Sequence, residues 1–408
     1  MCVLLINKEN KDNFLSSCFI CTVLFIQVFL VGSVLNAQAQ DVITKITIGY
    51  ISQTAELPPN LSNLETPPEN EGIAGGRISI DDNNTTGQFL KQNFILEHVH
   101  IGKDDNALTI LGQQISKGIH FFALNVPAKT LLKMADAVKG KNVLLLNAGA
   151  PDDRLRGPDC RNNVMHIVPS RGMYADALAQ FLVRKRWRNW FLVTGQRDRD
   201  KLFASAVRKS AKKFGAKIAA EKIWDFGADA RRTAQAEVPA FTQGVDYDIL
   251  IIADELGIFG EYIMFRSWDP RLVAGTQGLT PSTWHKTHEQ WGSAQLQSRF
   301  LKRFKRYMTA LDYQVWASIR ALGEAATRTG SGDFGKIETY LKTDEFKLAG
   351  FKGLPLNFRK WNWQLRQPIL LIHPAALVSV SPQQGFLHQR TTLDTLGLDD
   401  KESRCVLK

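Results

Sequence analysis

The sequence predicts an α/β chain of two lobes, each a parallel sheet flanked by helices, with a hinge between the lobes. Three observations predict this fold. Apolar strand-like runs alternate with helical patterns from residue 46 onward, the alternation starts again after residue 171, and several runs end in small or polar residues. Alternating strands and helices imply parallel strands joined by right-handed crossovers. The chain has 408 residues, which is enough for two domains of ordinary size.

The first lobe is expected over residues 41–170. Prolines make Ser52–Pro68 an irregular loop. Pro127 suits the first position of a helix, where its missing N–H would have no partner in any case. The expected strands are Ile46–Ile51, Phe94–Val99, Ile119–Val126 and Val143–Leu146, and the helices run from about Glu71 to between Asn83 and Gly87, from about Asn106 to Lys117, and from Pro127 onward.

The second lobe is expected over residues 171–279. Its strands are Trp190–Thr194, Ala216–Trp224, Asp248–Ala253 and Leu272–Ala274, and its helices are Met173–Lys185, Asp198–Phe214 and Ile258–Ser267. Helices Leu296–Met308, Val315–Arg328 and Phe334–Leu341, within about 280–342, are expected to return to the first lobe. Residues 345–380 are assigned to the second lobe, with a hairpin of 358–364 and 367–373 that turns near Leu365, and 381–408 form a polar, irregular tail.

The amino terminus has the pattern of a secretory signal. Lys8 and Lys11 precede the apolar run Cys18–Val31, and small residues follow at Ala37 and Ala39. The run of about 14 residues is shorter than the roughly 20 that a membrane span needs. We therefore expect residues 1–39 to be a signal peptide cleaved after Ala39, with an uncleaved anchor as the alternative. A cleaved signal places the protein in the periplasm.

Five cysteines divide between this leader and the rest of the chain. Cys2, Cys18 and Cys21 lie in the leader, which leaves Cys160 and Cys405. In an exported protein two cysteines suggest one disulfide, and two free thiols are the alternative.

The formal net charge is +11, which indicates either a basic solvated surface or a nucleic-acid partner. The chain has no Arg-rich helix, no RNP-like aromatic motif and no zinc-finger spacing, so the solvated surface is favoured and no nucleic-acid partner is expected.

The stretch Val143–Gly157, VLLLNAGAPDDRLRG, joins a buried strand to a loop of small and polar residues. The carboxyl ends of parallel strands face a crevice in open α/β sheets, and small residues let a ligand approach the backbone. The stretch therefore indicates either one edge of a ligand site or an ordinary strand-to-helix loop.

The order of elements resembles that of type I periplasmic binding proteins, the leucine/isoleucine/valine-binding relatives that serve ABC importers. Ile46–Ile51, Asp81–Gly87, Asn147–Asp153 and Ala274–Gly278 carry this resemblance. The chain is most similar to the subfamily associated with pyrroloquinoline-quinone (PQQ)-dependent alcohol dehydrogenase systems, through Pro67–Gly72, Ile80–Gly87, Cys160–Arg171 and Phe386–Gly397. The resemblance implies a monomer that binds a small molecule between its lobes, an ABC permease partner, a functional link to a quinoprotein alcohol dehydrogenase, no cofactor and no enzyme activity.

The resemblance also implies which positions line the cleft, and several depart from an amino-acid site. Pro151 and Asp152 stand where hydroxyls would hold a ligand carboxylate, 196–200 (QRDRD) lacks the covering aromatic, and Gln277 stands where an acid would meet the ligand amine. Acidic residues from both lobes would repel a carboxylate, so a cation or a polar hydroxylated ligand suits the site better. The expected ligand-binding residues are Asn147, Ala148, Gly149, Ala150, Asp152, Arg197, Asp198, Asp254, Glu255 and Gln277.

The sequence gives only weak support for a metal site. Four acidic clusters, if three converged, would suit a calcium- or lanthanide-like ion, whereas aspartates at helix starts are also ordinary caps. His285 and His288 would share one helical face but lack the metallopeptidase spacing, and no metal site is assigned. The four acidic clusters are Asp81–Asp82, Asp152–Asp153, Asp198 with Asp200, and Asp254–Glu255.

Two functions stay open: a solute-binding protein of an importer, or an accessory protein for quinoprotein maturation or for cofactor or metal supply.

Overall fold

The computed structural model describes residues 43–53, 67–225 and 230–407, and the backbone alone at 230–233. Thr44–Lys408 form one compact unit. The expected signal peptide and most of the expected proline-rich loop lie outside the described residues. Among the residues that are described, no helix is both long and apolar enough to cross a membrane.

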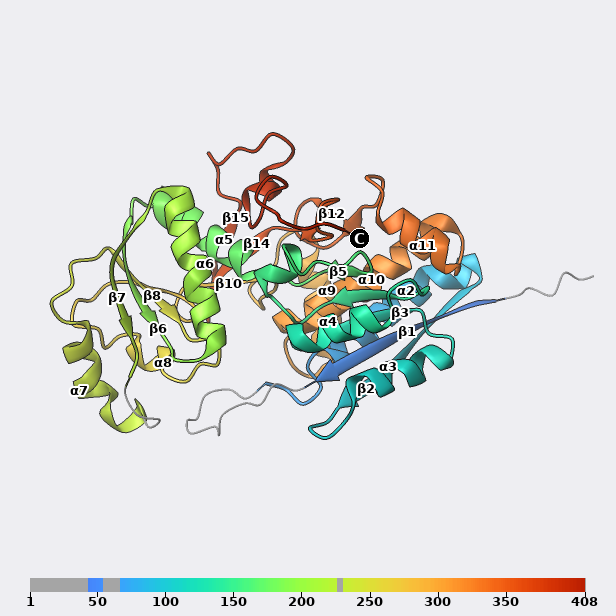
Figure 1. Cartoon of the computed structure of the whole chain (residues 1–408), viewed down its shortest axis with the longest axis horizontal. Coiled ribbons are helices and arrows are strands. Elements are labelled where there is room, and N and C mark those ends of the chain that lie inside the picture. The colour runs from blue at the N-terminus through green and yellow to red at the C-terminus, as the bar shows by residue number, and fades with distance from the viewer. Residues whose placement is uncertain (1–42, 54–66, 226–229, 408) are drawn as a thin grey trace, which may run out of the picture. The chain divides into compact units, whose positions relative to one another are not determined.

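The first sheet has five parallel strands in the order β2-β1-β3-β4-β5 (Figure 1). Helices cover both of its faces, because each face carries its own cluster of buried apolar side chains. The strands are β1 Thr44–Gln53, β2 Gln92–Ile101, β3 Phe121–Asn125, β4 Leu144–Asn147 and β5 Val164–His166, and the helices are α2 Ile73–Leu90, α3 Ala107–Ser116 and α4 Ala128–Ala137.

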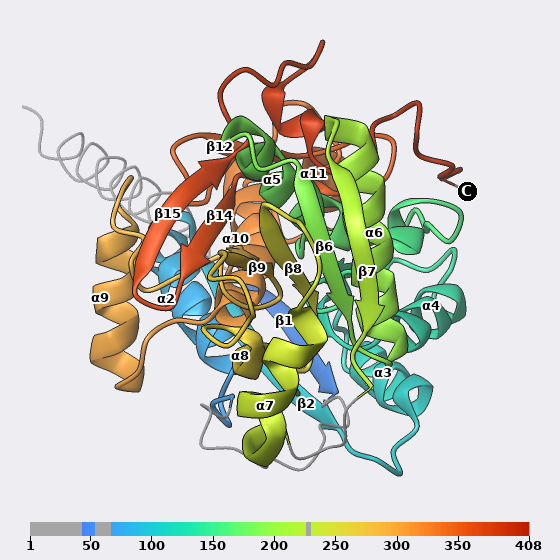
Figure 2. The same ribbon diagram turned by 90° about the vertical axis from the view of Figure 1, so that its left-hand side faces the viewer.

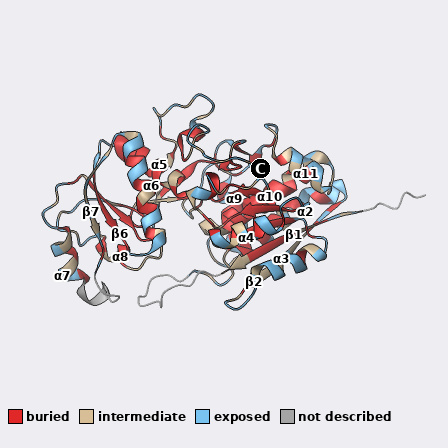
Figure 3. Cartoon of the chain, viewed as in Figure 1, coloured by how far each residue is buried: buried red, intermediate tan, exposed pale blue. Residues whose placement is uncertain are grey.

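The second sheet has four parallel strands in the order β7-β6-β8-β9 (Figure 2). Two further apolar clusters lie on its two faces, with α5 and α6 in one and α7 and α8 in the other. The strands are β6 Asn189–Thr194, β7 Lys217–Ile223, β8 Ile249–Ala253 and β9 Val273–Gly275, and the helices are α5 Arg171–Arg184, α6 Asp198–Phe214, α7 Ala230–Thr242 and α8 Gly260–Ile263. The two-lobed α/β fold is therefore confirmed, and Figure 3 shows the inner strands of both sheets largely buried.

The return segment packs on the first sheet. Helix α10 lies so close to α2 that a Cβ built on Gly75 would meet the carbonyl oxygen of Asp312 at 1.9 Å, so only glycine fits there. The segment contains β10 Thr280–Ser282, α9 Ser293–Phe304, α10 Ala310–Thr329, α11 Phe334–Leu341, β11 Leu348–Ala349, β12 Pro355–Phe358, β13 Leu365–Arg366, β14 Ile369–His373 and β15 Ala376–Ser381. Phe346, Leu356 and Leu365 belong to the core of the first lobe, and Ile369 and Leu371 to that of the second. We propose that the lobes divide near residue 367.

The hairpin expected to turn near Leu365 is wrong. Leu365 pairs back with Phe358 of β12, and the apolar strand β14 instead pairs with β15 and β10. The turn lies at the residues between His373 and Ala376, where Pro374 ends the strand. Strand β15 was not predicted, since half of its residues are polar or small.

Three helices also differ from expectation. The helix expected over Ile258–Ser267 is only Gly260–Ile263, because Met264 is extended and Phe265 has a φ of 67°. Helix α7 was not predicted, and it contains Pro239, a residue that normally ends a helix. The helix expected over Leu296–Met308 ends at Phe304, where Lys305 adopts the left-handed conformation.

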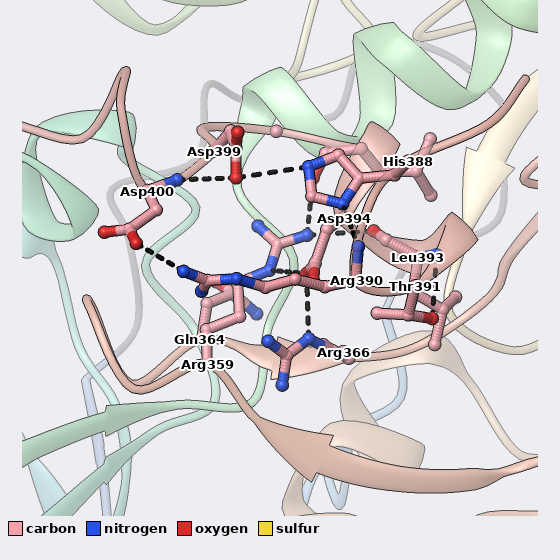
Figure 4. Close-up of polar contacts among 12 residues, drawn as sticks. Arg359, Gln364, Arg366, His388, Arg390, Thr391, Leu393, Asp394, Asp399 and Asp400 are labelled. Atoms are coloured by element: carbon pink, nitrogen blue, oxygen red, sulfur yellow. Dashed lines mark hydrogen bonds and ion pairs between the residues drawn. The ribbon is translucent and has the colours of Figure 1, made fainter.

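The carboxyl-terminal tail has little regular structure, as expected, but it is firmly attached. Arg359 and Arg366 each donate to Oδ1 of Asp394, at 3.0 and 2.8 Å, and the side chain of Asp394 is fully buried (Figure 4). Cys405 forms a disulfide with Cys160. The predicted disulfide is therefore present, and it ties the tail to the loop that follows β4.

Candidate functional site

A pocket of ≈ 190 Å³ lies at the carboxyl ends of β8 and β9. The loop after β4 in the first lobe contributes Pro151, and the start of α5 contributes Tyr174. Loops at this edge of parallel strands are where α/β sheets bind ligands. The pocket is lined by Pro151, Tyr174, Phe203, Asp254, Glu255, Gly275, Thr276, Gln277, Thr280 and Pro281.

Arg171, the first residue of α5, joins acidic residues from two separate loops beside this pocket. Its Nε and Nη2 donate to the two carboxylate oxygens of Glu255 at 2.6 and 2.7 Å, and its Nη1 lies 3.0 Å from Oδ2 of Asp152. Burial alone would lower the pKa of Arg171, but the hydrogen bond to Glu255 and the charges of Glu255 and Asp152 outweigh burial and raise it. Asp152 follows β4 and Glu255 follows β8, so Arg171 holds the two sheet edges together.

Backbone contacts fix the same junction. The N–H of Arg171 donates to the carbonyl of Pro151 at 2.8 Å, and the N–H of Gly172 donates to Oδ1 of Asp153 at 2.9 Å. Ser170 caps α5 by accepting a hydrogen bond from the N–H of Met173. The first turn of α5 and the loop after β4 therefore form one local unit.

The loop after β4 is held by Asn147, one of the expected ligand-binding residues. Its Oδ1 accepts from the N–H groups of Gly149 and Ala150, and its Nδ2 donates to the carbonyl of Ala150. Asn147, Ala148 and Ala150 are buried, and Gly149 is half-buried. A Cβ on Gly149 would meet Oδ1 of Asn125 at 2.1 Å, so close packing against β3 requires glycine here.

Asp254 and Gln277 both line the pocket, as the sequence suggested. Oδ2 of Asp254 accepts from the N–H groups of Phe259 and Gly260, both at 2.8 Å. Its Oδ1 is buried and has no hydrogen-bond partner among the described residues. Gln277 donates to the carbonyl of Asp254 and accepts from the hydroxyl of Thr276, so both ends of its amide support the loop.

Further carboxylates surround Asp254. Burial raises the pKa of Asp200, and the charges of Asp254 and Glu255 act in the same direction. Burial also raises the pKa of Glu261, and the charge of Asp254 adds to it. The electrostatic environment of the pocket is therefore acidic beyond the charges that Arg171 balances.

Arg197 and Asp198, also expected at the site, are not among the residues that line the pocket. Both are exposed, and Asp198 is the first residue of α6. Asp200, also in the first turn of α6, supports the loop structure: its Oδ1 accepts from the N–H of Glu255, and its Oδ2 accepts from the N–H of Arg197.

The acidic clusters do not converge as a whole. Asp81 and Asp82 instead form ion pairs with Arg303 and Arg299 of α9. In the part of the chain that the structure describes, no group of three or more His, Cys, Asp or Glu side chains could hold a metal ion. His285 and His288 precede α9 and lie outside any helix, contrary to expectation: His285 contacts Thr287, and His288 contacts the carbonyl of Phe351.

Arg171 was not predicted as a site residue, and neither was most of the wall that α5, α6, the end of β9 and β10 supply. A local signal existed, because Ser170 is a good helix cap and therefore places Arg171 in the first turn of a helix. Its two acidic partners are distant in sequence, and no local pattern indicates them. The missed wall residues are Tyr174, Phe203, Gly275, Thr276, Thr280 and Pro281.

Solved structures share this fold. A branched-chain amino acid ABC transporter periplasmic ligand-binding protein from Burkholderia xenovorans LB400 matches with a TM-score of 0.68 and 16% identity, over 89% of this chain and 99% of that one. A leucine-, isoleucine-, valine-, threonine- and alanine-binding protein from Brucella ovis matches with a TM-score of 0.67 and 14% identity, over the same shares. An ABC transporter solute-binding protein from R. palustris, in complex with benzoate, matches with a TM-score of 0.62 and 12% identity, over 89% and 100%.

No curated protein matches the chain in sequence. The family model described as periplasmic binding protein matches residues 100–381, which is more than half of the chain. That match covers β3 to β5 of the first sheet, the whole second sheet and the return segment, and it agrees with the two-lobed fold. This chain belongs to the periplasmic binding protein family.

Proposed function

We propose that this protein is the solute-binding component of an ABC-type importer in the periplasm, and that it binds a small ligand in the pocket beside Arg171. The observation that carries the proposal is the joining of Asp152, Arg171 and Glu255, which brings loops from the two sheets to one pocket. Pockets at such strand ends are the usual ligand sites of open α/β sheets. The structural neighbours, which are named as ABC transporter binding proteins, support the same role.

In this proposal the two lobes bind the ligand between them, and the protein catalyses no reaction. The ligand would be enclosed between the loop after β4 and the loops after β8 and β9, and closure would present a surface to a permease. Residues 1–39 would be removed on export. The site would consist of the pocket-lining residues together with Asp152 and the loop 147–150, while the exposed Arg197 and Asp198 would meet ligand only at its entrance.

We further propose that the importer serves a PQQ-dependent alcohol dehydrogenase system. The support is the resemblance of Pro67–Gly72, Ile80–Gly87, Cys160–Arg171 and Phe386–Gly397 to proteins of such systems. An accessory role in quinoprotein maturation, without transport, is the alternative, and the departures from an amino-acid site favour it. Genes for a permease and an ATPase beside this one would support transport, and their absence would support the accessory role.

Thermal unfolding in the presence of a panel of small solutes tests the binding function. A ligand at one hundred times its Kd stabilises the folded state by about 2.7 kcal/mol, which is a measurable rise in melting temperature. Thr280→Trp should fill the pocket and abolish the rise, whereas Thr86→Trp, at an exposed position of α2, should keep it. If a solute still raises the melting temperature of Thr280→Trp, its binding site lies outside this pocket. If no solute raises the melting temperature of the wild type, the proposal is contradicted.

A further inference from the structure

Three polar side chains of the pocket, those of Glu255, Thr276 and Gln277, form hydrogen bonds within the protein. Both carboxylate oxygens of Glu255 accept from Arg171. The hydroxyl of Thr276 accepts from the N–H of Asp254 and lies 2.6 Å from Oε1 of Gln277, while Nε2 of Gln277 donates to the carbonyl of Asp254. These contacts fix the shape of the wall around the pocket.

Oδ1 of Asp254 differs from these groups. Asp254 has no exposed surface, it lines the pocket, and this oxygen has no hydrogen-bond partner among the described residues. A buried acceptor without a donor is costly, and native proteins generally satisfy such groups. The other oxygen, Oδ2, is held by two backbone N–H groups, which fix the direction of the carboxylate.

The charges near this oxygen favour a donor and disfavour an anion. The guanidinium of Arg171 is already shared by Glu255 and Asp152. Asp200 and Glu261 lie near enough for the charge of Asp254 to raise their pKa values. A ligand carboxylate would therefore lie next to the carboxylates of these residues, and the one cation among them, Arg171, is already paired. Like charges in a buried site repel strongly.

From these contacts we infer that the ligand donates an N–H or O–H hydrogen bond to Oδ1 of Asp254, through an ammonium or a hydroxyl group, and carries no carboxylate. This inference rests on the proposed binding function and specifies the class of ligand. The volume of ≈ 190 Å³ is below the roughly 300 Å³ at which pockets for drug-sized ligands begin, so the ligand is a small amine, amino alcohol or polyol.

Three probes with one carbon skeleton test the inference: 1-amino-2-propanol, propane-1,2-diol and lactate. They differ at one terminal carbon, which carries an ammonium, a hydroxyl or a carboxylate. Calorimetric titration of the exported protein should show binding of the amine, the diol or both, and at least tenfold weaker binding of lactate. The ratio between amine and diol tells which donor the site prefers.

The variant Asp254→Asn places an amide donor where Oδ1 stands and keeps an acceptor for the N–H groups of Phe259 and Gly260. It should weaken binding of the amine or the diol by tenfold or more, as expected for a lost hydrogen bond to a charged group. Glu261→Gln is the matched control, because it removes a charge of the same sign from a residue that does not line the pocket, and it should keep binding within about threefold. A melting temperature near that of the wild type shows that each variant folds.

Three outcomes would overturn the inference. Lactate could bind more tightly than the other two probes, or Asp254→Asn could leave amine and diol binding unchanged, and in both cases the binding function would survive. If the three probes and every solute of the wider panel fail to bind, the binding function and the inference fail together. A wider-panel ligand whose binding requires Asp254 and that has no carboxylate would support the inference.

Discussion

The guanidinium of Arg171 forms two hydrogen bonds with the carboxylate of Glu255, at 2.6 and 2.7 Å, and its remaining nitrogen meets Asp152 at 3.0 Å. Only 5% of Arg171 is exposed, so these contacts form largely out of water. One cation therefore bridges two carboxylates that come from different loops.

Replacing Arg171 with alanine should lower the free energy of unfolding by about 3–5 kcal/mol, because it leaves two carboxylates that are each less than a fifth exposed without their cation. Urea unfolding measures the change. Arg161→Ala is the control: Arg161 forms a similar two-nitrogen contact with Asp136, but at the surface, where such pairs contribute about 0–1 kcal/mol. Equal losses in the two variants would show that burial of Arg171 adds nothing.

The disulfide between Cys160 and Cys405 closes a loop with a sequence separation of 245 residues. Cross-links of this kind stabilise chiefly by restricting the unfolded chain, by about 2–5 kcal/mol. Cys405→Ser should therefore lower the urea midpoint, and a reductant should lower the wild-type midpoint to the same value.

The same reductant should leave Cys405→Ser unchanged, because that variant has no disulfide to reduce. If reduction shifts both proteins equally, the reductant acts on something other than this bond. If it shifts neither and the variant matches the wild type, the cross-link makes no contribution to stability.

Local sequence signals were enough to predict most helices. Helix α6 runs over Asp198–Phe214 as predicted, since acidic residues lie in its first turn and Gly215 takes the left-handed conformation after its end. Helix α11 begins after the capping residue Asp333 and also has the predicted bounds. Where such signals conflict, as at Pro239 inside α7, the prediction failed.

Strand partners and the site depend on contacts between distant residues, which local patterns do not encode. The apolar strand β14 was recognised, yet its partners are β10 and β15 rather than the preceding segment. Asp152 and Glu255 were both placed at the site, but the repulsion expected from them is reduced because Arg171 lies between them. The loop glycines and Asn147 turned out to support the backbone, which composition alone does not distinguish from ligand contact.

Asp394 should be the most sensitive residue of the tail. Its Oδ1 accepts from both Arg359 and Arg366, and the side chain of Arg359 is only 1% exposed. Asp394→Asn removes the charge that compensates two cations and should lower the free energy of unfolding by about 3–5 kcal/mol. Asp400→Asn is the control in the same cluster, because Asp400 pairs with Arg390 at the surface (Figure 4), and it should cost at most about 1 kcal/mol. A wild-type midpoint for Asp394→Asn in urea would contradict this prediction.

Stability should fall as the solution becomes acidic, with His166 as one cause. Burial lowers the pKa of His166 well below 6.5, and the charge of Arg156 acts in the same direction. Below about pH 6.5 the unfolded chain therefore binds a proton that the folded protein excludes, and each such group removes about 1.4 kcal/mol per pH unit until the folded pKa is reached.

The test is the free energy of unfolding in urea between pH 7.5 and about pH 5. Burial also lowers the pKa of His288, so the wild-type slope has more than one source, and His166→Gln should make the slope shallower without removing it. Glutamine keeps an acceptor for Nδ2 of Asn147, which contacts His166 at 3.0 Å. His120→Gln, at an exposed position, controls for the His-to-Gln exchange itself. Parallel curves for the wild type and His166→Gln would mean that this histidine takes up its proton equally in the folded and unfolded states.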